Sequence, residues 1–392
     1  MRHVSEPERR ARLAVRHALV PAHRASSPEA VTQAMTALHA TEPATVYLSC
    51  WARMGAFEVT DLDTALYQER SLVKQLAMRR TLFVFPRDLL PAVWPSASAR
   101  VATLERARLS KQIVRCGLAE DGGDWLDRAR AEVLTVLADE PDGRSAMEIR
   151  AAVPMIDVRS SVPATETLSS SNVLVYLGVC GDVVRATNAG RWYTSRPRWT
   201  LMHHWLGDTP SAWVAAEGYR ELVRRWLYTF GPGTEDDLVW WLGGTKTVVR
   251  AALAALDAVQ VSLDGGGTGW LLPDDLAEVA DPGPWVALLP VLDPTVMGWR
   301  GRDFYLGPHG DRVFDFRGNA GTTAWADGRI VGCWVQDEEG VVRVRLLERV
   351  PARTCRALDA EATRLTAWLG GLRIGSVYRS PAMNDSAIHG GQ

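Results

Sequence analysis

Two polar side chains, two residues apart, stand out in the stretch TALHATEPATVYLSCWARM, residues 36–54. The imidazole of a histidine such as His39 is mostly neutral at the pH of a cell, so it can accept a proton from water and keep that water oriented. The hydroxyl of Thr41 both donates and accepts, and can hold the same water or contact a phosphate. The structural alternative is a packed connection between two core helices, with Thr41 as the cap of the second helix. The residue types alone leave both interpretations open.

The proline after this pair determines how the two side chains can be directed. A residue before proline is held out of the α region, so a helix that enters the segment should end near Glu42. Side chains two positions apart point the same way from an extended backbone and roughly opposite ways from a helix. An unwound helix end would therefore let His39 and Thr41 face one cleft.

Helix signals followed by strand signals recur three times along the chain. Each instance has helices that begin at a Ser or Thr cap and ends in short β segments joined by a polar turn. The predicted caps are Ser27, Ser145, Thr234 and Thr245. The predicted helices are 27–40, 44–54, 61–78, 124–140, 145–153, 165–181, 217–231, 234–243 and 245–258, and the β-rich segments are 79–86, 182–195 and 259–273. Helix, short helix, helix and hairpin is the winged-helix pattern.

After residue 284 the pattern changes to alternating apolar and polar residues around Asp-Gly and Glu-Gly turns. A last helix is predicted over 355–371. We therefore expect an α+β protein with winged-helix units at 1–115, 116–205 and 206–283. An antiparallel sheet or small barrel with its final helix should follow at 284–392.

Composition narrows the class of protein. The net charge of −2 excludes a uniformly basic coat for nucleic acid, although a local basic face remains compatible with it. The five cysteines form no CxxC pair, which argues for reduced thiols and against a zinc site, and His203-His204 has no further ligand nearby. No apolar run approaches the ~20 residues of a membrane helix. We expect a cytoplasmic protein without membrane contact, metal or cofactor.

Several stretches together resemble the AlkZ-like DNA glycosylases, often described as winged-helix DNA-binding domain-containing proteins. They are LHATEPATVYLSCWAR, RSLVKQLAMRRTLFVFP, LLPVLDPTVMGW, GNAGTTAWADGRIVGCWVQ and RLTAWLGGLR, together with the three wing patterns. The resemblance covers nearly the whole chain. It implies three tandem winged helices around a concave cleft of DNA size, supported by a β-barrel region. It also implies removal of bulky or crosslinking N7-alkylated guanines, in some members as self-resistance to a genotoxin.

This chain departs from the family at the catalytic triplet. The best-known members carry two glutamines, or a glutamine and an aspartate, around one apolar residue, whereas the matching positions here are His39, Ala40 and Thr41. The resemblance implies that His39 orients and deprotonates water and that Thr41 assists. Asp293 lies in another matching stretch and could stabilise a developing sugar cation, or it could simply begin an Asp-Pro turn.

Candidate DNA contacts are an aromatic side chain and cations near the expected wings and the triplet. Trp192 beside Arg191 could stack or wedge, and the arginines could meet phosphates. The candidates are Arg53, Arg79, Arg80, Arg191 and Trp192. We expect a monofunctional glycosylase that acts as a monomer on double-stranded DNA bearing alkylated guanine.

Two alternatives remain from the sequence. The altered triplet is compatible with a non-catalytic winged-helix protein, either a transcriptional regulator or a protein that shields lesions. A weaker alternative is an unrelated enzyme that uses His39 as a base toward a small molecule and has no affinity for DNA.

Overall fold

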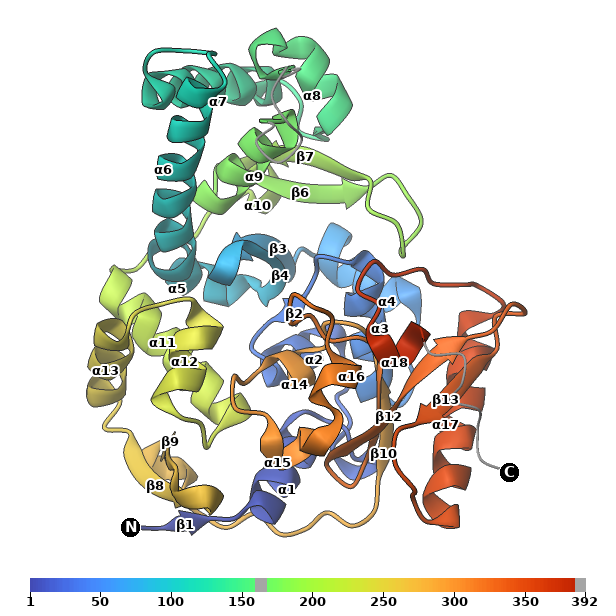
Figure 1. The fold of residues 1–392 in the computed structure, drawn as a ribbon. Helices are drawn as coiled ribbons and strands as arrows, with labels where there is room; N and C mark the ends of the chain where they lie inside the picture. Colours follow the sequence, from blue (N-terminus) through green and yellow to red (C-terminus); the bar gives the residue numbers. More distant parts are fainter. Residues whose placement is uncertain (159–167, 385–392) are drawn as a thin grey trace. The chain divides into compact units, whose positions relative to one another are not determined.

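The structure, a computed structural model, describes residues 1–158 and 168–384 and divides into two compact units (Figure 1). One unit combines Met1–Leu62 with Leu222–Gln392, and the other comprises Asp63–Glu221. The chain passes between the units at α4 (Val59–Asp63) and within α11 (Ala215–Phe230). The range 1–115, expected as one winged helix, is thus shared between two units.

The first unit takes its helices from both ends of the chain. The longer ones are α1 (Glu6–Arg16), α2 (Pro28–Ala34), α3 (Pro43–Arg53), α12 (Glu235–Leu242), α13 (Lys246–Ala255) and α17 (Ala352–Leu369). The short ones are α14 (Pro294–Met297), α15 (Asp303–Leu306), α16 (Gly310–Val313) and α18 (Pro381–Asn384).

An antiparallel sheet forms the frame of the C-terminal region. Its strands are β10 (Val286–Leu289), β11 (Thr323–Ala326), β12 (Arg329–Gln336) and β13 (Val342–Leu346), in that order. All neighbours are antiparallel, and α17 packs against the two outer strands, β10 and β13. The predicted sheet and final helix are confirmed. In the described part of the chain the sheet is open, because β10 and β13 are its edges and do not pair with each other.

A second sheet in this unit holds the third predicted hairpin. Strands β8 (Val259–Leu263) and β9 (Thr268–Leu271) are antiparallel, with a glycine-rich turn between them, and β1 (His3–Val4) adds in parallel to β8. The hairpin follows α12 and α13, whose caps Thr234 and Thr245 accept hydrogen bonds from Asp237 N and Val248 N. The local cap signals were therefore sufficient to place both helices.

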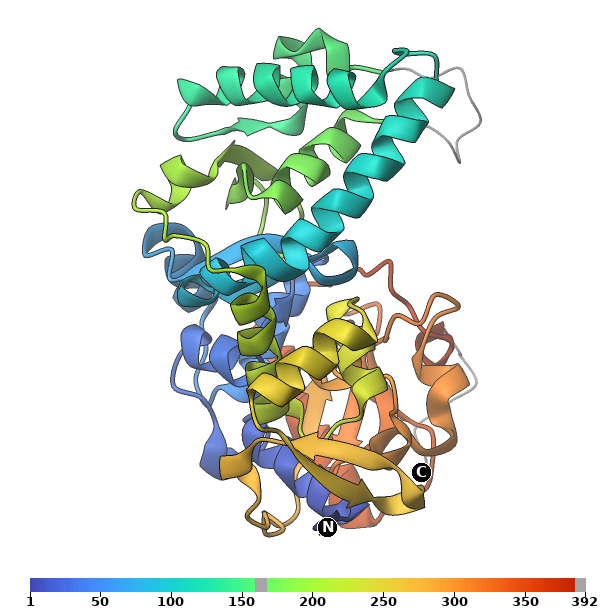
Figure 2. The same ribbon diagram turned by 90° about the vertical axis from the view of Figure 1, so that its left-hand side faces the viewer.

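The second unit is built from α5 (Leu90–Val93), α6 (Ala99–Arg115), α7 (Gly122–Ala138), α8 (Ala146–Ala152), α9 (Ser170–Cys180) and α10 (Met202–Leu206). Its strands are β3 (Leu72–Ala77), β4 (Thr81–Pro86), β5 (Arg144–Ser145), β6 (Val183–Asn188) and β7 (Pro197–Leu201). The long helices α6 and α7, cyan and teal in Figure 2, follow each other and both pack against α9. Strands β5, β7 and β6 form one sheet of this unit, in that order.

Three predicted boundaries were wrong, two of them at a residue with left-handed backbone. The helix predicted over 61–78 stops before Arg70, which adopts a left-handed backbone (φ 56°), and the next residues form strand β3. The helix predicted over 27–40 ends at Ala34, because Thr36 is also left-handed (φ 64°). In the second hairpin the return strand starts only at Pro197, so residues 189–196 form a long loop.

Two further predictions bear on the ends of helices. Ser145 forms a complete capping box with Glu148, as its position predicted. The start of the helix predicted at 165–181 lies partly outside the described residues, and α9 is seen from Ser170.

None of the helices within residues 1–158 and 168–384 is both long and apolar enough to cross a membrane.

Candidate active site

The triplet lies between two helices in non-helical backbone. Strand β2 (Leu38–His39) is followed by a bend at Thr41 and Glu42, and α3 begins at Pro43. Glu42 has an extended conformation (φ −99°, ψ 124°), as a residue before proline requires. The helix predicted over 27–40 included His39, whereas in the structure α2 ends at Ala34 and both His39 and Thr41 lie outside a helix. The His39 side chain is nearly buried, with 7% of its surface exposed, whereas Thr41 is exposed.

Arg53 and Asp293 are both buried, and Asp293 caps the short helix α14 that begins at Pro294, as the Asp-Pro alternative predicted. They form a fully buried two-pronged ion pair, with Nη2 at 2.7 Å from Oδ1 and Nη1 at 2.9 Å from Oδ2. Ser49 Oγ donates to Oδ2 and the Thr295 amide donates to Oδ1, both at 2.9 Å. Burial would raise the pKa of Asp293, but the charge of Arg53 and these hydrogen bonds hold it below its ordinary value. Neither side chain reaches solvent in this structure, so we reassign both to the support of α3.

A buried histidine extends this polar network toward α1. His17 Nδ1 lies 2.9 Å from Thr295 Oγ1, which also accepts a hydrogen bond from Arg53. Its Nε2 lies 3.2 Å from the Thr229 carbonyl oxygen, and its ring stacks on Trp299. Burial and the nearby Arg53 charge lower the pKa of His17 to about 3, so this imidazole is neutral. No local pattern predicted a buried histidine here, because its partners come from distant segments.

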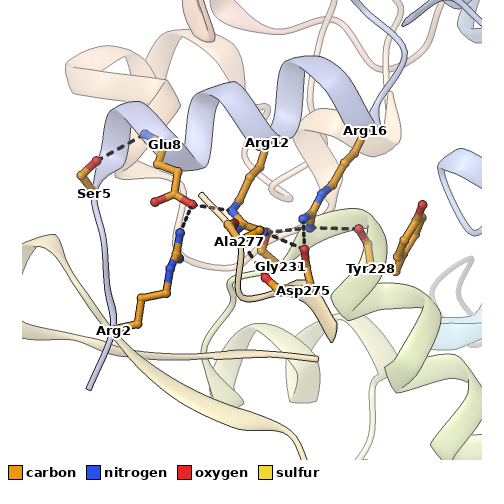
Figure 3. Close-up of polar contacts among 9 residues, drawn as sticks. All are labelled: Arg2, Ser5, Glu8, Arg12, Arg16, Tyr228, Gly231, Asp275 and Ala277. Atoms are coloured by element: carbon orange, nitrogen blue, oxygen red, sulfur yellow. Dashed lines mark hydrogen bonds and ion pairs between the residues drawn. The ribbon is translucent and has the colours of Figure 1, made fainter. Parts of the chain in front are cut away.

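Helix α1 is fixed by arginines that bond within the first unit (Figure 3). Arg12 donates to Glu8 at 2.9 Å, and to the side chain of Asp275 at 3.0 Å, and only 1% of its side chain is exposed. Arg16 bonds the same Asp275 and the carbonyl oxygens of Tyr228 and Gly231. The charges of these arginines are therefore paired inside the first unit, which fits a net charge near zero.

A pocket of about 220 Å³ opens beside the triplet, at the start of α3. Its walls are one face of α3, the ends of β10 and β12, and the C-terminal segment 373–383. The lining residues are Glu42, Ala44, Thr45, Leu48, Pro290, Val291, Thr322, Trp334, Val335, Gln336, Arg373, Ile374, Gly375, Ser376, Arg379 and Met383. Glu42 connects this pocket to the triplet, because it directly follows Thr41.

Glu42 is a site residue that the sequence predictions missed. Its carboxylate does not cap α3. Instead Oε1 accepts hydrogen bonds from Ser376 Oγ at 2.9 Å and from the Val377 amide at 2.8 Å. Burial raises the pKa of Glu42. No local signal could have shown this, because the partners lie more than three hundred positions away in the sequence.

A rigid turn near the same C-terminal segment presents an aromatic side chain to solvent. Phe316 is 91% exposed, and the guanidinium of Arg317 lies 5.0 Å from the centre of its ring. Asp315 fixes the turn by accepting hydrogen bonds from the amides of Arg317 and Asn319 and from the Asn319 side chain. At Gly321 an added Cβ would collide with Ser380 and Met383. The residues that follow this turn thus pack closely against the C-terminal segment whose Ser376 and Val377 bond Glu42. In the same region α16 lies beside α18 (Figure 1).

The other predicted DNA contacts belong to the second unit. Arg79 and Arg80 lie in the tight turn between β3 and β4, both with left-handed backbone, and not in a strand as expected. Arg80 is partly exposed and forms an ion pair with Glu105 at 2.9 Å. Arg191 is exposed in the loop between β6 and β7, where it donates to Tyr193 Oη at 2.7 Å, and Trp192 packs edge-on against the same tyrosine. The loop therefore carries a cation and aromatic rings together.

Within residues 1–158 and 168–384, no group of three or more His, Cys, Asp or Glu side chains is placed to hold a metal ion.

Residues 32–368 match the family model described as DNA glycosylase AlkZ-like. The chain belongs to the AlkZ-like DNA glycosylase family. The match spans most of the chain and includes the triplet, the Asp293 segment and the β-sheet.

The fold of this glycosylase is similar to that of a solved member. It superposes on Streptomyces sahachiroi DNA glycosylase AlkZ with a TM-score of 0.75 and 20% sequence identity, over 94% of this chain and 98% of that chain. No curated protein matches the sequence significantly. Family membership therefore assigns DNA glycosylase activity, and the structural similarity shows that the fold is shared across nearly the full chain.

Proposed function

We propose that this glycosylase hydrolyses the N-glycosidic bond of bulky N7-alkylguanine adducts in double-stranded DNA, without strand cleavage. The observation that carries the proposal is the placement of the His39-Ala40-Thr41 triplet. The resemblance to the family matches this triplet to the catalytic position, and it lies in non-helical backbone before α3, with Thr41 exposed and the next residue, Glu42, lining a pocket. Repair of genotoxin damage or self-resistance is the corresponding biological role.

The chemistry demands little of these residues. Alkylation at N7 gives guanine a positive charge, which weakens its bond to the sugar and removes the need for strong acid assistance. His39 would accept the proton of the attacking water, and the Thr41 hydroxyl would hold that water or the neighbouring phosphate. General-base assistance is worth about 10²–10⁴-fold in rate.

Contact with DNA would come from cations and aromatic side chains in the turns and loops of each unit. Arg79, Arg80, Arg191 and Trp192 would meet the backbone from the turns of the second unit, as winged-helix units do. Phe316 and Arg317 would serve in the first unit, since an exposed aromatic side chain beside a cation is suited to stack on a base step.

The test is base release from duplexes that carry either N7-methylguanine or a bulky intercalating N7 adduct at one position. We expect release of the free bulky base at a rate above spontaneous depurination, faster than for the methyl adduct. The product strand should be an intact abasic site, and borohydride should trap no protein–DNA crosslink. Tight DNA binding with no release from either duplex would instead indicate a binding protein that has lost the reaction.

A further inference from the structure

The carboxylate of Glu42 is held in one fixed orientation at the edge of the pocket. Both hydrogen bonds to it, from Ser376 Oγ and the Val377 amide, end on Oε1. Within the described ranges no hydrogen bond ends on Oε2 and no Lys, Arg or His forms an ion pair with Glu42. One oxygen is therefore used to fix the group, and the other is left available to a ligand.

Much of the remaining pocket wall is apolar or aromatic. Leu48, Val291 and Met383 line it, together with the indole of Trp334, whose Nε1 donates to the Leu289 carbonyl at 2.8 Å. The volume of about 220 Å³ far exceeds the ~10–15 Å³ that admits one water, so the pocket has room for a ring system.

The two arginines of the lining do not neutralise the carboxylate. Arg379 donates to the Asn384 side chain and to the Met383 carbonyl oxygen, at 2.7 and 2.9 Å. Arg373 is exposed at the mouth, where a DNA phosphate could approach. A fixed carboxylate without a cationic partner, beside an indole and aliphatic walls, suits a flat cation whose charge is spread over a ring.

We propose that this pocket binds the positively charged, N7-substituted purine of the lesion, with Glu42 Oε2 as its counter-charge. The inference rests on the proposed function and specifies how the same site would select its substrate. Charge leaves the base as the glycosidic bond breaks, so Glu42 acts on lesion binding more than on the chemical step. Neutral lesions of similar size lack this contact and bind less tightly.

The test measures binding rather than turnover. The probe is a duplex with N7-methylguanine on a 2′-fluorinated sugar, which resists hydrolysis, compared with the same duplex carrying unmodified guanine and with one carrying the neutral ring-opened N7-methyl derivative. Glu42→Gln is the main variant, because its amide oxygen can still accept from Ser376 and Val377. Glu58→Gln, an exposed glutamate of the same unit, is the matched control.

We expect wild type and Glu58→Gln to bind the cationic lesion at least tenfold more tightly than either neutral duplex, and Glu42→Gln to bind all three alike. An unchanged preference in Glu42→Gln, or no preference in wild type, would overturn the inference. A base-release assay on the same proteins distinguishes failure of this inference from failure of the proposed function. Wild type that releases base while Glu42→Gln keeps the cation preference refutes only the pocket, whereas a Glu42-dependent preference without release refutes only the reaction.

Discussion

The side chains of Arg53 and Asp293 meet with both carboxylate oxygens and both terminal guanidinium nitrogens bonded, in an interior that excludes solvent. Removing two charges from water is costly, and the cost is offset because both carboxylate oxygens of Asp293 and both terminal nitrogens of Arg53 are hydrogen-bonded. The network ties α3, which follows the triplet directly, to the segment that begins at Asp293 and, through Thr295, to His17. Helix α3, which starts next to His39 and Thr41, is thus held by residues buried in the interior.

Replacing one partner of this pair should be strongly destabilising. Asp293→Ala leaves the Arg53 guanidinium buried without a counter-charge, so we expect a loss of about 3–5 kcal/mol in the free energy of unfolding, measured by urea titration. The control is Arg343→Ala, which removes a 65% exposed side chain and its ion pair with Asp337 and should cost less than about 1 kcal/mol. Equal losses in the two variants would contradict a structural role for the buried pair.

His17 should make stability depend on pH. Its folded pKa of about 3 lies below the ~6.5 of an unfolded histidine, so between these values the unfolded chain binds one more proton. Stability should therefore fall as pH decreases from 6.5, by up to about 1.4 kcal/mol per pH unit from this group. Urea titrations of wild type and His17→Asn across pH 4.5–7.5 would show a shallower slope in the variant. Parallel slopes would show that His17 is not buried in its neutral form.

At the scale of elements, the starts of four helices could be predicted from the chemistry of their cap residues. Ser27, Ser145, Thr234 and Thr245 each accept a hydrogen bond from the third residue after them, which needs no information from elsewhere in the chain. Strand β3 was missed because its apolar residues also fit a helix, and the left-handed Arg70 that ends the helix has no signature such as glycine.

The candidate site could be predicted only in part for the same reason. The extended backbone of Glu42 follows from the adjacent Pro43, whereas the earlier end of α2 at Ala34 had no local signature. The orientation of Glu42 depends on Ser376, and the burial of Arg53 depends on Asp293. Such long-range contacts are set by packing of the whole unit, so a single sequence contains no local signal for them.

The Phe316 turn gives an element-level prediction. Phe316→Ala should weaken binding to lesion-containing duplex by about 1–3 kcal/mol, because one stacked aromatic ring is lost, while thermal stability is unchanged at a position that is 91% exposed. Fluorescence anisotropy and thermal unfolding provide the two measurements. Leu104→Ala, an exposed apolar residue on α6, is the control and should leave binding unchanged. Wild-type affinity in Phe316→Ala would remove this turn from the DNA contact.

At the scale of the whole molecule, DNA binding has to come from local groups of cations, because the net charge is −2. Many arginines are bonded internally, as Arg12, Arg16 and Arg53 show. The fold is shared with the solved Streptomyces glycosylase at 20% identity, so the scaffold tolerates wide changes in sequence. The exposed loop cations are the part of the surface that should determine affinity for the backbone.

Arg191→Gln tests this view through salt dependence. Each phosphate neutralised by the protein adds about −0.9 to the slope of log K against log salt concentration, so loss of one contact should make the slope shallower by about that amount. Binding to undamaged duplex between 50 and 200 mM salt gives the slope. Arg353→Gln on α17 serves as a control for the loss of one exposed charge. A wild-type slope in Arg191→Gln would exclude a phosphate contact at this loop.

The most direct test of the account is single-turnover base release from a duplex carrying a bulky N7-alkylguanine, compared among wild type, His39→Ala and Thr41→Ala. If the triplet acts on water as proposed, the rate should fall at least tenfold in His39→Ala and by a smaller factor in Thr41→Ala, with DNA affinity and thermal stability retained. Release at the wild-type rate by a folded His39→Ala protein would contradict the account and place the reaction elsewhere in the fold.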